Sequence, residues 1–290
     1  MFFRSRPTAW TKTHLLTLHK AASPFVWMKG YFYQPEKGPR GETYMRQNLA
    51  EVLTREIFVE GMGPIEGRRF LDVGCGAGDY MALIAHMGGN VSGIDLNTQQ
   101  LERGRAAFAS AGLRGDFVEG DARTLPFADG QFDVVYSADV FEHLSYETKQ
   151  SLIAEMYRVL KPGGIVIIKT PNLDYLRVTI MLRRFMRLLR LKSPFIYIEH
   201  TRNNPDNEHH GLSTYRELNH LFGAQQFLEP ETIHVPLLRG KLYIARDSWL
   251  PLRTLFNECI ILRYRKSVFL PTAEMLIAQA NPTLLQEVGT

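Results

Sequence analysis

Short apolar runs alternate with amphipathic stretches between residues 67 and 170. Apolar runs of this length are typical of buried strands, and an apolar position every three or four residues is typical of a helix that packs on a sheet. The expected strands are Arg69–Val73, Asn90–Asp95, Asp116–Glu119, Phe132–Ser137 and Gly164–Thr170. The expected helices are Asp79–Met87, Thr98–Ser110 and Tyr146–Leu160. This alternation predicts an α/β fold with a parallel sheet covered by helices.

Three segments of different character make up the rest of the predicted organisation. We expect an N-terminal arm and helix over residues 1–66, a central domain over 67–246, and a C-terminal helical appendage over 247–290. The helix of the first segment is expected at about Glu42–Val59, because glycine and proline residues follow it.

The second half of the central domain begins with residues 171–211, which break the alternation and are expected to be an insertion or lid. A helix is then expected at Thr214–Phe222, where Thr214 and Glu217 have the spacing of a capping box. Two further strands are expected at Phe227–Val235 and Lys241–Arg246.

A glycine-rich turn follows the first expected strand, in the order Asp-Val-Gly-Cys-Gly-Ala-Gly from Asp72 to Gly78. Glycines in such a turn adopt backbone angles that other residues avoid and let a ligand approach the main chain. The dinucleotide fingerprint GxGxxG requires glycine where this chain has Asp79, so the pattern GxGxG favours another ligand. The second strand ends at Asp95, which is either a ribose ligand or a cap of the next helix; the glycine turn favours the ribose.

The stretch from Phe70 to Thr170 resembles the UbiE/UbiG-like family of class I S-adenosylmethionine (SAM)-dependent methyltransferases, with a methyltransferase type 11 domain. The resemblance is carried by six motifs in order: Leu71–Gly78, Ile94-Asp95, Gly120–Ala122, Leu125–Phe127, Phe132–Val135 and Leu160–Gly164. It implies a Rossmann-like, doubly wound sheet of seven strands in the order 3-2-1-4-5-7-6, with the last strand antiparallel. SAM is the implied cofactor, bound at the carboxyl ends of the strands.

The resemblance also implies roles for individual residues. Asp72 would interact with the SAM ammonium group, Asp95 with the ribose, and Asp121 with the adenine amine. The other cofactor-binding residues that we predict are Gly74, Gly76, Gly78, Leu96, Ala122 and Ser137.

Three histidines are candidate bases for methyl transfer to a hydroxyl group, because an unperturbed imidazole accepts a proton near neutral pH. His143 follows the fourth strand, where the methyl group should emerge, and a structural role in holding that loop is an equal alternative. His209 and His210 precede the Thr214 helix, where the alternative is a loop-ordering or exposed pair.

Basic and apolar residues alternate at helical spacing within Asp174–Lys192. The arginines of residues 176–191 favour peripheral contact with an anionic membrane, a grip on an acidic acceptor, or the solvated face of a lid. No apolar run reaches the roughly 18 residues that span a bilayer. A basic excess of only +4 and the absence of an Asn/Asp-Pro-Pro-Tyr/Phe motif argue against nucleic acid as the substrate.

The first 35 residues contain five basic residues and no acidic one. This composition is typical of an organelle transit peptide and equally of a basic surface arm on a cytoplasmic protein, and we adopt the second interpretation. There are two cysteines, Cys75 and Cys259, and neither CxxC nor HExxH, so we predict no disulfide and no metal site.

The sequence thus predicts a SAM-dependent methyltransferase that acts on oxygen of a small-molecule, lipid-linked or saccharide acceptor. One alternative is a quinone or other aromatic O- or C-methyltransferase. Another is a SAM-binding regulator or assembly factor without activity. The acceptor and the oligomeric state cannot be read from the sequence, because pocket residues come from segments that match the family least.

Overall fold

The computed structural model describes residues 54–191, 209–228, 230–233, 237–239, 242–244 and 259–268. Residues 54–60 are helical and form the described end of the helix expected at Glu42–Val59. The rest of that helix, the basic arm and the last 22 residues lie outside the described part of the chain.

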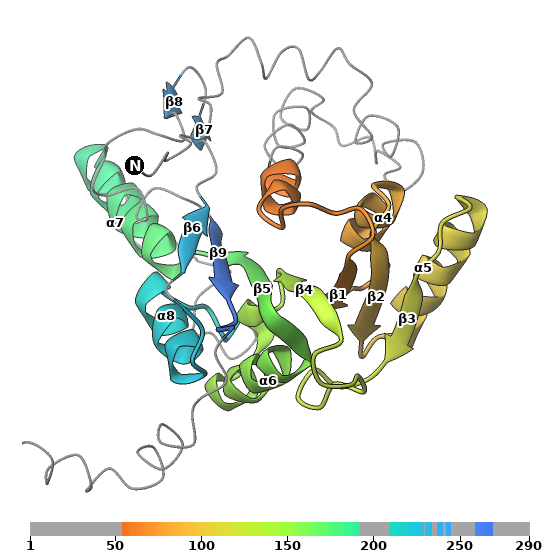
Figure 1. Ribbon diagram of the computed structural model, residues 1–290. Coiled ribbons are helices and arrows are strands. Elements are labelled where there is room, and N and C mark those ends of the chain that lie inside the picture. The colour runs from red at the N-terminus through yellow and green to blue at the C-terminus, as the bar shows by residue number, and fades with distance from the viewer. Residues whose placement is uncertain are drawn as a thin grey trace, which may run out of the picture.

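Strands and helices alternate through the central region, as the apolar pattern predicts (Figure 1). The strands of the first part are β1 (Arg69–Val73), β2 (Asn90–Asp95), β3 (Asp116–Glu119), β4 (Phe132–Ala138) and β5 (Leu160–Pro171). The helices between them are α4 (Asp79–His86), α5 (Thr98–Ser110), a 3-10 turn η1 (Phe141–His143) and α6 (Tyr146–Val159). After β5 come α7 (Leu173–Leu189), α8 (Tyr215–Ala224), β6 (Glu231–Ile233), β7 (Leu237–Arg239), β8 (Leu242–Ile244) and β9 (Cys259–Arg265).

Seven strands form one sheet in the order β3-β2-β1-β4-β5-β9-β6. The first five run parallel, and β9 is antiparallel to both β5 and β6. This is the predicted order 3-2-1-4-5-7-6, with β9 as its antiparallel seventh strand. The predicted fold class is therefore confirmed.

The position of the seventh strand in the sequence was predicted wrongly. We expected it at Lys241–Arg246, but β8 in that segment pairs only with β7, in a separate two-stranded sheet. The strand between β5 and β6 is β9, within the stretch expected to be a helical appendage. Both segments combine a short apolar run with basic residues, so the local pattern does not distinguish them. β9 differs in having a paired strand on each side, β5 and β6, and its residues Ile260, Ile261 and Leu262 are buried.

Two apolar cores cover the two faces of the sheet, because successive strand residues point to opposite sides. Residues such as Val135 and Ile168 pack against α6 and α8, whereas Val134 and Ile167 pack against α4, α5 and residues 54–60. The ring of Phe222 on α8 stacks on Tyr264 of β9 with centroids 4.0 Å apart. This arrangement is the doubly wound architecture seen in Figure 1.

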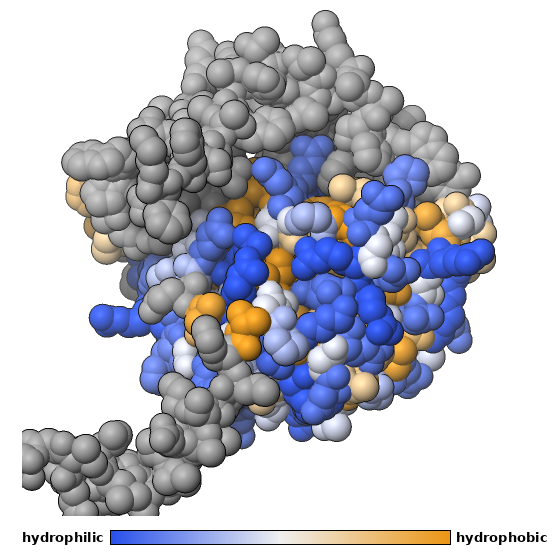
Figure 2. All heavy atoms as spheres, viewed as in Figure 1, coloured by the Kyte–Doolittle hydropathy of each residue, from blue (hydrophilic) through white to orange (hydrophobic). Residues whose placement is uncertain are grey.

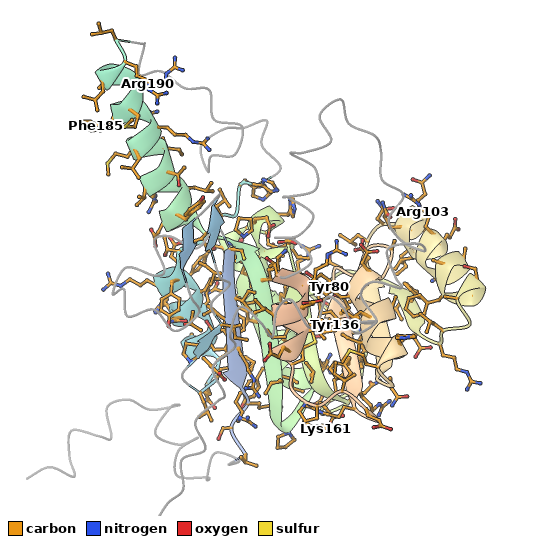
Figure 3. All side chains as sticks on the ribbon, turned by 90° about the horizontal axis from the view of Figure 1, so that it is seen from above. Tyr80, Arg103, Tyr136, Lys161, Phe185 and Arg190 are labelled. Atoms are coloured by element: carbon orange, nitrogen blue, oxygen red, sulfur yellow. The ribbon has the colours of Figure 1, made fainter. Side chains whose placement is uncertain are left out.

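Two features of the later segments agree with their sequence patterns. The capping box at the start of α8 is present, with Thr214 and Glu217 bonded to each other's backbone N–H groups. The basic stretch forms α7, which extends away from the sheet and carries Phe185 and Arg190 toward its far end (Figure 3). None of the described helices is long and apolar enough to span a bilayer.

Candidate functional site

The glycine turn lies at the carboxyl end of β1 and leads directly into α4. Gly74, Gly76 and Gly78 all have positive φ angles, of 78°, 51° and 83°. A Cβ on Gly74 would lie 2.3 Å from Val140, and one on Gly78 would lie 2.9 Å from the Phe117 ring. A Cβ on Gly76 would meet nothing within 4 Å. The outer glycines are therefore required by close packing, and the middle one leaves the backbone open to a ligand.

Backbone hydrogen bonds hold this turn against β2. The N–H groups of Gly74 and Cys75 both donate to the carbonyl oxygen of Ile94, at 2.8 and 3.1 Å. The N–H of Gly76 donates to Asp95 Oδ2 at 2.8 Å. The turn is therefore shaped before any ligand arrives.

Asp95 lies beside the turn, as the sequence predicts, but it is not a helix cap. Its Oδ1 accepts the N–H of Asn97 at 2.8 Å, and the cap of α5 is the Asn97 side chain, which accepts the N–H of Gln100. A carboxylate has about four acceptor positions, so each oxygen retains one for a ligand hydroxyl. Leu96, the next residue, is 70% exposed at the same edge.

Asp72 is a buried acid in the middle of the site. It is paired in register with Tyr136 of β4, and both side chains are almost fully buried. Burial raises the pKa of Asp72 well above its ordinary value; the Tyr136 hydroxyl opposes the rise, and the carboxylates of Asp95 and Asp79 add to it. A buried acid of this kind suits a cationic ligand group, which would restore its charge.

The Tyr136 hydroxyl was not anticipated from the sequence. It has no hydrogen-bond partner of normal geometry among the described residues, even though Asp72 lies beside it. The rings of Phe58 and Tyr80 pack edge-on against that of Tyr136, with centroids 6.2 and 6.4 Å away. Tyr80 and Tyr136 are labelled in Figure 3. A tyrosine directly after the apolar pair Val134-Val135 of a buried strand was the signal that could have identified it.

Asp121, predicted to bind the adenine amine, is engaged by Arg123 in this structure. Asp121 Oδ2 accepts from Arg123 Nε at 2.8 Å and Nη2 at 2.5 Å, and Oδ1 accepts the Arg123 N–H at 2.8 Å. These hydrogen bonds lower the pKa of Asp121 and keep it ionised. Ala122, which lies between Asp121 and Arg123 in the sequence, packs against the apolar core.

Ser137 serves the sheet through its side chain. Its Oγ donates to the carbonyl oxygen of Val73 at 2.9 Å, so it joins the ends of β4 and β1 where the glycine turn begins. Its predicted backbone contact with the cofactor stays a prediction.

Two of the three candidate histidines come together, and the third does not. The rings of His143 and His209 have centroids 4.8 Å apart, and the Glu142 carboxylate completes the group. His210 is exposed and outside this group. Val140, which packs on Gly74, connects the histidine group to the glycine turn.

Glu142 is 2% exposed and accepts a hydrogen bond from Thr170 Oγ1 at 3.0 Å. Burial raises its pKa, as does the charge of Asp139.

The segment that carries His209 is fixed by a buried lysine that sequence reasoning missed. Lys149 Nζ donates to the carbonyl oxygen of Gly211 and, at 2.8 Å, to Ser213 Oγ. The N–H of Gly211 donates to the Glu142 carbonyl oxygen at 2.7 Å. Lys149 occupies the same face of α6 as the buried Leu152 and Met156, and a lysine at this helical spacing was the available signal.

Comparison with known proteins finds a family match over part of the chain. Residues 71–168 match the family described as "Methyltransferase domain". The chain is similar to 24-methylenesterol C-methyltransferase 2 of Oryza sativa subsp. japonica, with 44% identity over 104 residues, 35% of this chain and 28% of the relative. It is similar to the ubiquinone biosynthesis O-methyltransferase of Sinorhizobium medicae, with 32% identity over 129 residues, 44% of this chain and 50% of the relative.

The chain spans half or less of the length of these two relatives. Among solved structures, a SAM dependent methyltransferase from Aquifex aeolicus has a TM-score of 0.50 at 17% identity, over 77% of this chain and 97% of that protein. At this identity the likeness concerns the fold alone.

Proposed function

We propose that the chain transfers a methyl group from SAM to an oxygen of a small acceptor, because residues 71–168 match the family described as "Methyltransferase domain". The acceptor class we propose is a small molecule, a lipid-linked compound or a saccharide. The observation that carries the proposal is the glycine turn with a carboxylate on each side, Asp72 and Asp95, next to the histidine group.

The residues of the turn fit SAM by their chemistry. The open backbone at Gly76 leaves room for a ligand, Asp95 retains acceptors for two ribose hydroxyls, and buried Asp72 faces no described cation that would pair with it. When bound, SAM supplies a methyl group on a positively charged sulfur that leaves as a neutral thioether.

The chain's own contribution is to hold the reactants in line and exclude water. Alignment of this kind is worth up to about 7–11 kcal/mol in the best intramolecular reactions. An acceptor hydroxyl must also lose a proton, and His143 and His209 are the side chains at the rim that can accept one. The names of the relatives include both O- and C-methyltransferases, so a quinone or other aromatic acceptor is the alternative.

The surface of α7 favours an apolar or membrane-bound acceptor over a free saccharide. Met181, Phe185 and Leu189 are 56–66% exposed along this helix, between four arginines. Most of the described surface in the view of Figure 2 is hydrophilic. A helix with apolar and cationic residues binds at the interface of an anionic bilayer.

The test is to incubate the purified chain with methyl-labelled SAM and cell extracts, and to follow labelled products by mass spectrometry and S-adenosylhomocysteine by chromatography. We expect a labelled oxygen ether or ester together with stoichiometric S-adenosylhomocysteine. Tight SAM binding without any labelled product would favour the regulator or assembly factor instead.

The membrane contribution is tested separately by sedimentation with vesicles of phosphatidylglycerol or phosphatidylcholine. We expect binding to the anionic vesicles only, and its loss in Phe185→Ser. Leu228→Ser, at an exposed leucine outside α7, is the control. Equal binding of both variants would reject the role of α7.

A further inference from the structure

The group formed by Glu142, His143 and His209 has the composition of a metal site. One donor atom from each of the three residues lies within 4.8 Å of the other two. They come from two segments, the η1 turn after β4 and the chain just before α8. Two imidazoles and a carboxylate form a common ligand set for zinc and other divalent transition metals.

The surroundings of this group hold its members in place. Thr170 Oγ1 donates to Glu142 Oε2 at 3.0 Å, which orients the carboxylate. The N–H of Gly211 bonds to the Glu142 backbone, and a Cβ on Gly211 would lie 2.1 Å from the Leu144 carbonyl oxygen. The chain next to His209 is thus pressed against the η1 turn. Supporting hydrogen bonds of this kind are typical of metal sites and strengthen them.

We propose that Glu142, His143 and His209 bind one divalent transition-metal ion, with zinc as the best match, at the rim of the methyl-donor site. Zinc lies about 2.0–2.2 Å from histidine nitrogen and carboxylate oxygen, so tetrahedral ligands are separated by about 3.3 Å. The donor atoms lie within 4.8 Å of one another, so each distance between two of them has to shorten by about 1.5 Å at most. Rotation of the side chains can supply this movement.

Three protein ligands leave a fourth position for an oxygen of the acceptor, as in catalytic rather than structural zinc sites. The location suits this role, because Val140 of the same loop packs on Gly74 of the cofactor turn.

This role, unlike the metal binding itself, rests on the proposed function. A hydroxyl held by a divalent cation loses its proton more readily. The proton passes to solvent water, the oxygen–carbon bond forms, and the carbon–sulfur bond breaks with its electron pair left on sulfur. His143 and His209 would then be metal ligands and not bases.

The test uses the untagged full chain after treatment with EDTA, with ZnCl2 as the calorimetric titrant. We expect one equivalent of zinc per chain and at least about a tenfold loss of affinity in His143→Ala and in His209→Ala. His210→Ala is the matched control, because it removes a neighbouring imidazole that lies outside the group. It should bind zinc as the unmodified chain does.

A second measurement needs no substitution. CoCl2 added to the EDTA-treated chain should produce the visible absorption bands of four-coordinate cobalt, and ZnCl2 should displace them. Absence of saturable binding to the folded chain would overturn the proposal, as would equal losses in His209→Ala and His210→Ala.

Parallel assays separate this proposal from the proposed function. Zinc binding by a chain that binds SAM but methylates nothing would support the site and reject the O-methyltransferase. Methyl transfer at the same rate in EDTA and in zinc would reject the metal's role in the reaction and leave the function standing.

Discussion

The two sides of the site are held in different ways. On the side of β1 and β2, backbone N–H groups and short turns do the holding: Gly74 donates to Ile94, and Gly76 to Asp95, within a few residues of the strand ends. On the side of β4 and β5, side chains from distant segments meet, and Lys149 fixes the chain that brings in His209. The side of β1 and β2, which we propose as the cofactor side, therefore depends on single carboxylates and glycines. The side of β4 and β5, which we propose as the acceptor side, depends on contacts between residues distant in sequence.

The largest expected effect is a loss of SAM affinity when Asp95, on the proposed cofactor side, is replaced. Asp95→Ala removes the proposed ribose acceptor and also the acceptor of the Gly76 N–H, so the turn loses part of its shape. Two charge-assisted hydrogen bonds are worth about 1.5–3 kcal/mol each. We therefore expect SAM affinity to fall by about a hundredfold or more in calorimetric titration.

The control for this variant is Asp116→Ala. Asp116 is an exposed acid at the other end of the sheet, where β3 begins. It should leave SAM affinity within about twofold. An Asp95→Ala chain with unchanged affinity would show that the ribose is not bound here, and it would remove the main contrast between the two sides.

The same contrast explains which parts of the structure were predictable from sequence. The turn from Gly74 to Gly78 and the acid at Asp95 are local patterns, fixed by backbone angles and strand ends, and the structure places them together as expected. β9 was missed because its burial comes from two partner strands distant in sequence. The contact between His143 and His209 depends on tertiary structure, which the hydrophobic periodicity of the sequence does not reveal. The hydrogen bond from Arg123 to Asp121 depends on the side-chain conformation, which the periodicity does not reveal either.

The acceptor side is tested most strongly at its anchor. Lys149→Met approximately keeps the length of the side chain and removes the charged donor to Gly211 and Ser213. The buried Gly211 carbonyl oxygen then keeps the weaker bond from Ser213 Oγ, at 3.2 Å. Such a loss costs about 1–3 kcal/mol, so we expect the free energy of unfolding in urea to fall by about 2 kcal/mol.

A positioning role for Lys149 also has a local readout. Amide hydrogen exchange should accelerate at residues 209–213 and stay unchanged at residues 74–78. Lys161→Met, at the opposite end of β5 (Figure 3), should change neither segment. Faster exchange in both segments of Lys149→Met would mean that the two sides are not held independently.

Replacement of Asp72 is expected to have smaller effects, of opposite sign on stability and on SAM affinity. Burial raises the pKa of this carboxyl, so its contribution to folding is fully present below its unfolded pKa of about 3.8 and is lost as pH rises through the folded pKa. Asp72→Asn carries no such charge. We expect it to raise the free energy of unfolding at neutral pH by about 1 kcal/mol and to lower SAM affinity about tenfold.

The pH dependence identifies the cause. The stability gain of Asp72→Asn should shrink as pH falls from the raised folded pKa of Asp72 toward its unfolded value of about 3.8, because in this range the folded chain already holds the proton that the unfolded chain takes up only at lower pH. SAM binding to the unmodified chain should release a proton, seen as a dependence of the binding heat on the buffer. A less stable Asp72→Asn chain would contradict the assignment of Asp72 as a buried acid that no cation in the described part of the chain neutralises.

The smallest effect tests the outer edge of the cofactor side, where the Asp121–Arg123 pair is exposed. In our prediction the adenine amine shares the Asp121 carboxylate with Arg123, so Arg123→Ala should raise SAM affinity. An exposed ion pair contributes little, and salt weakens it further. We therefore expect a gain of at most about threefold in low salt, measured by titration, which disappears at about 0.5 M salt.

Arg103→Ala on α5 removes the same charge from an exposed position away from Asp121 and should have no effect on SAM affinity. A fall in affinity in Arg123→Ala alone would mean that the guanidinium contacts the cofactor itself, and that this edge, unlike the rest of its side, relies on a mobile side chain.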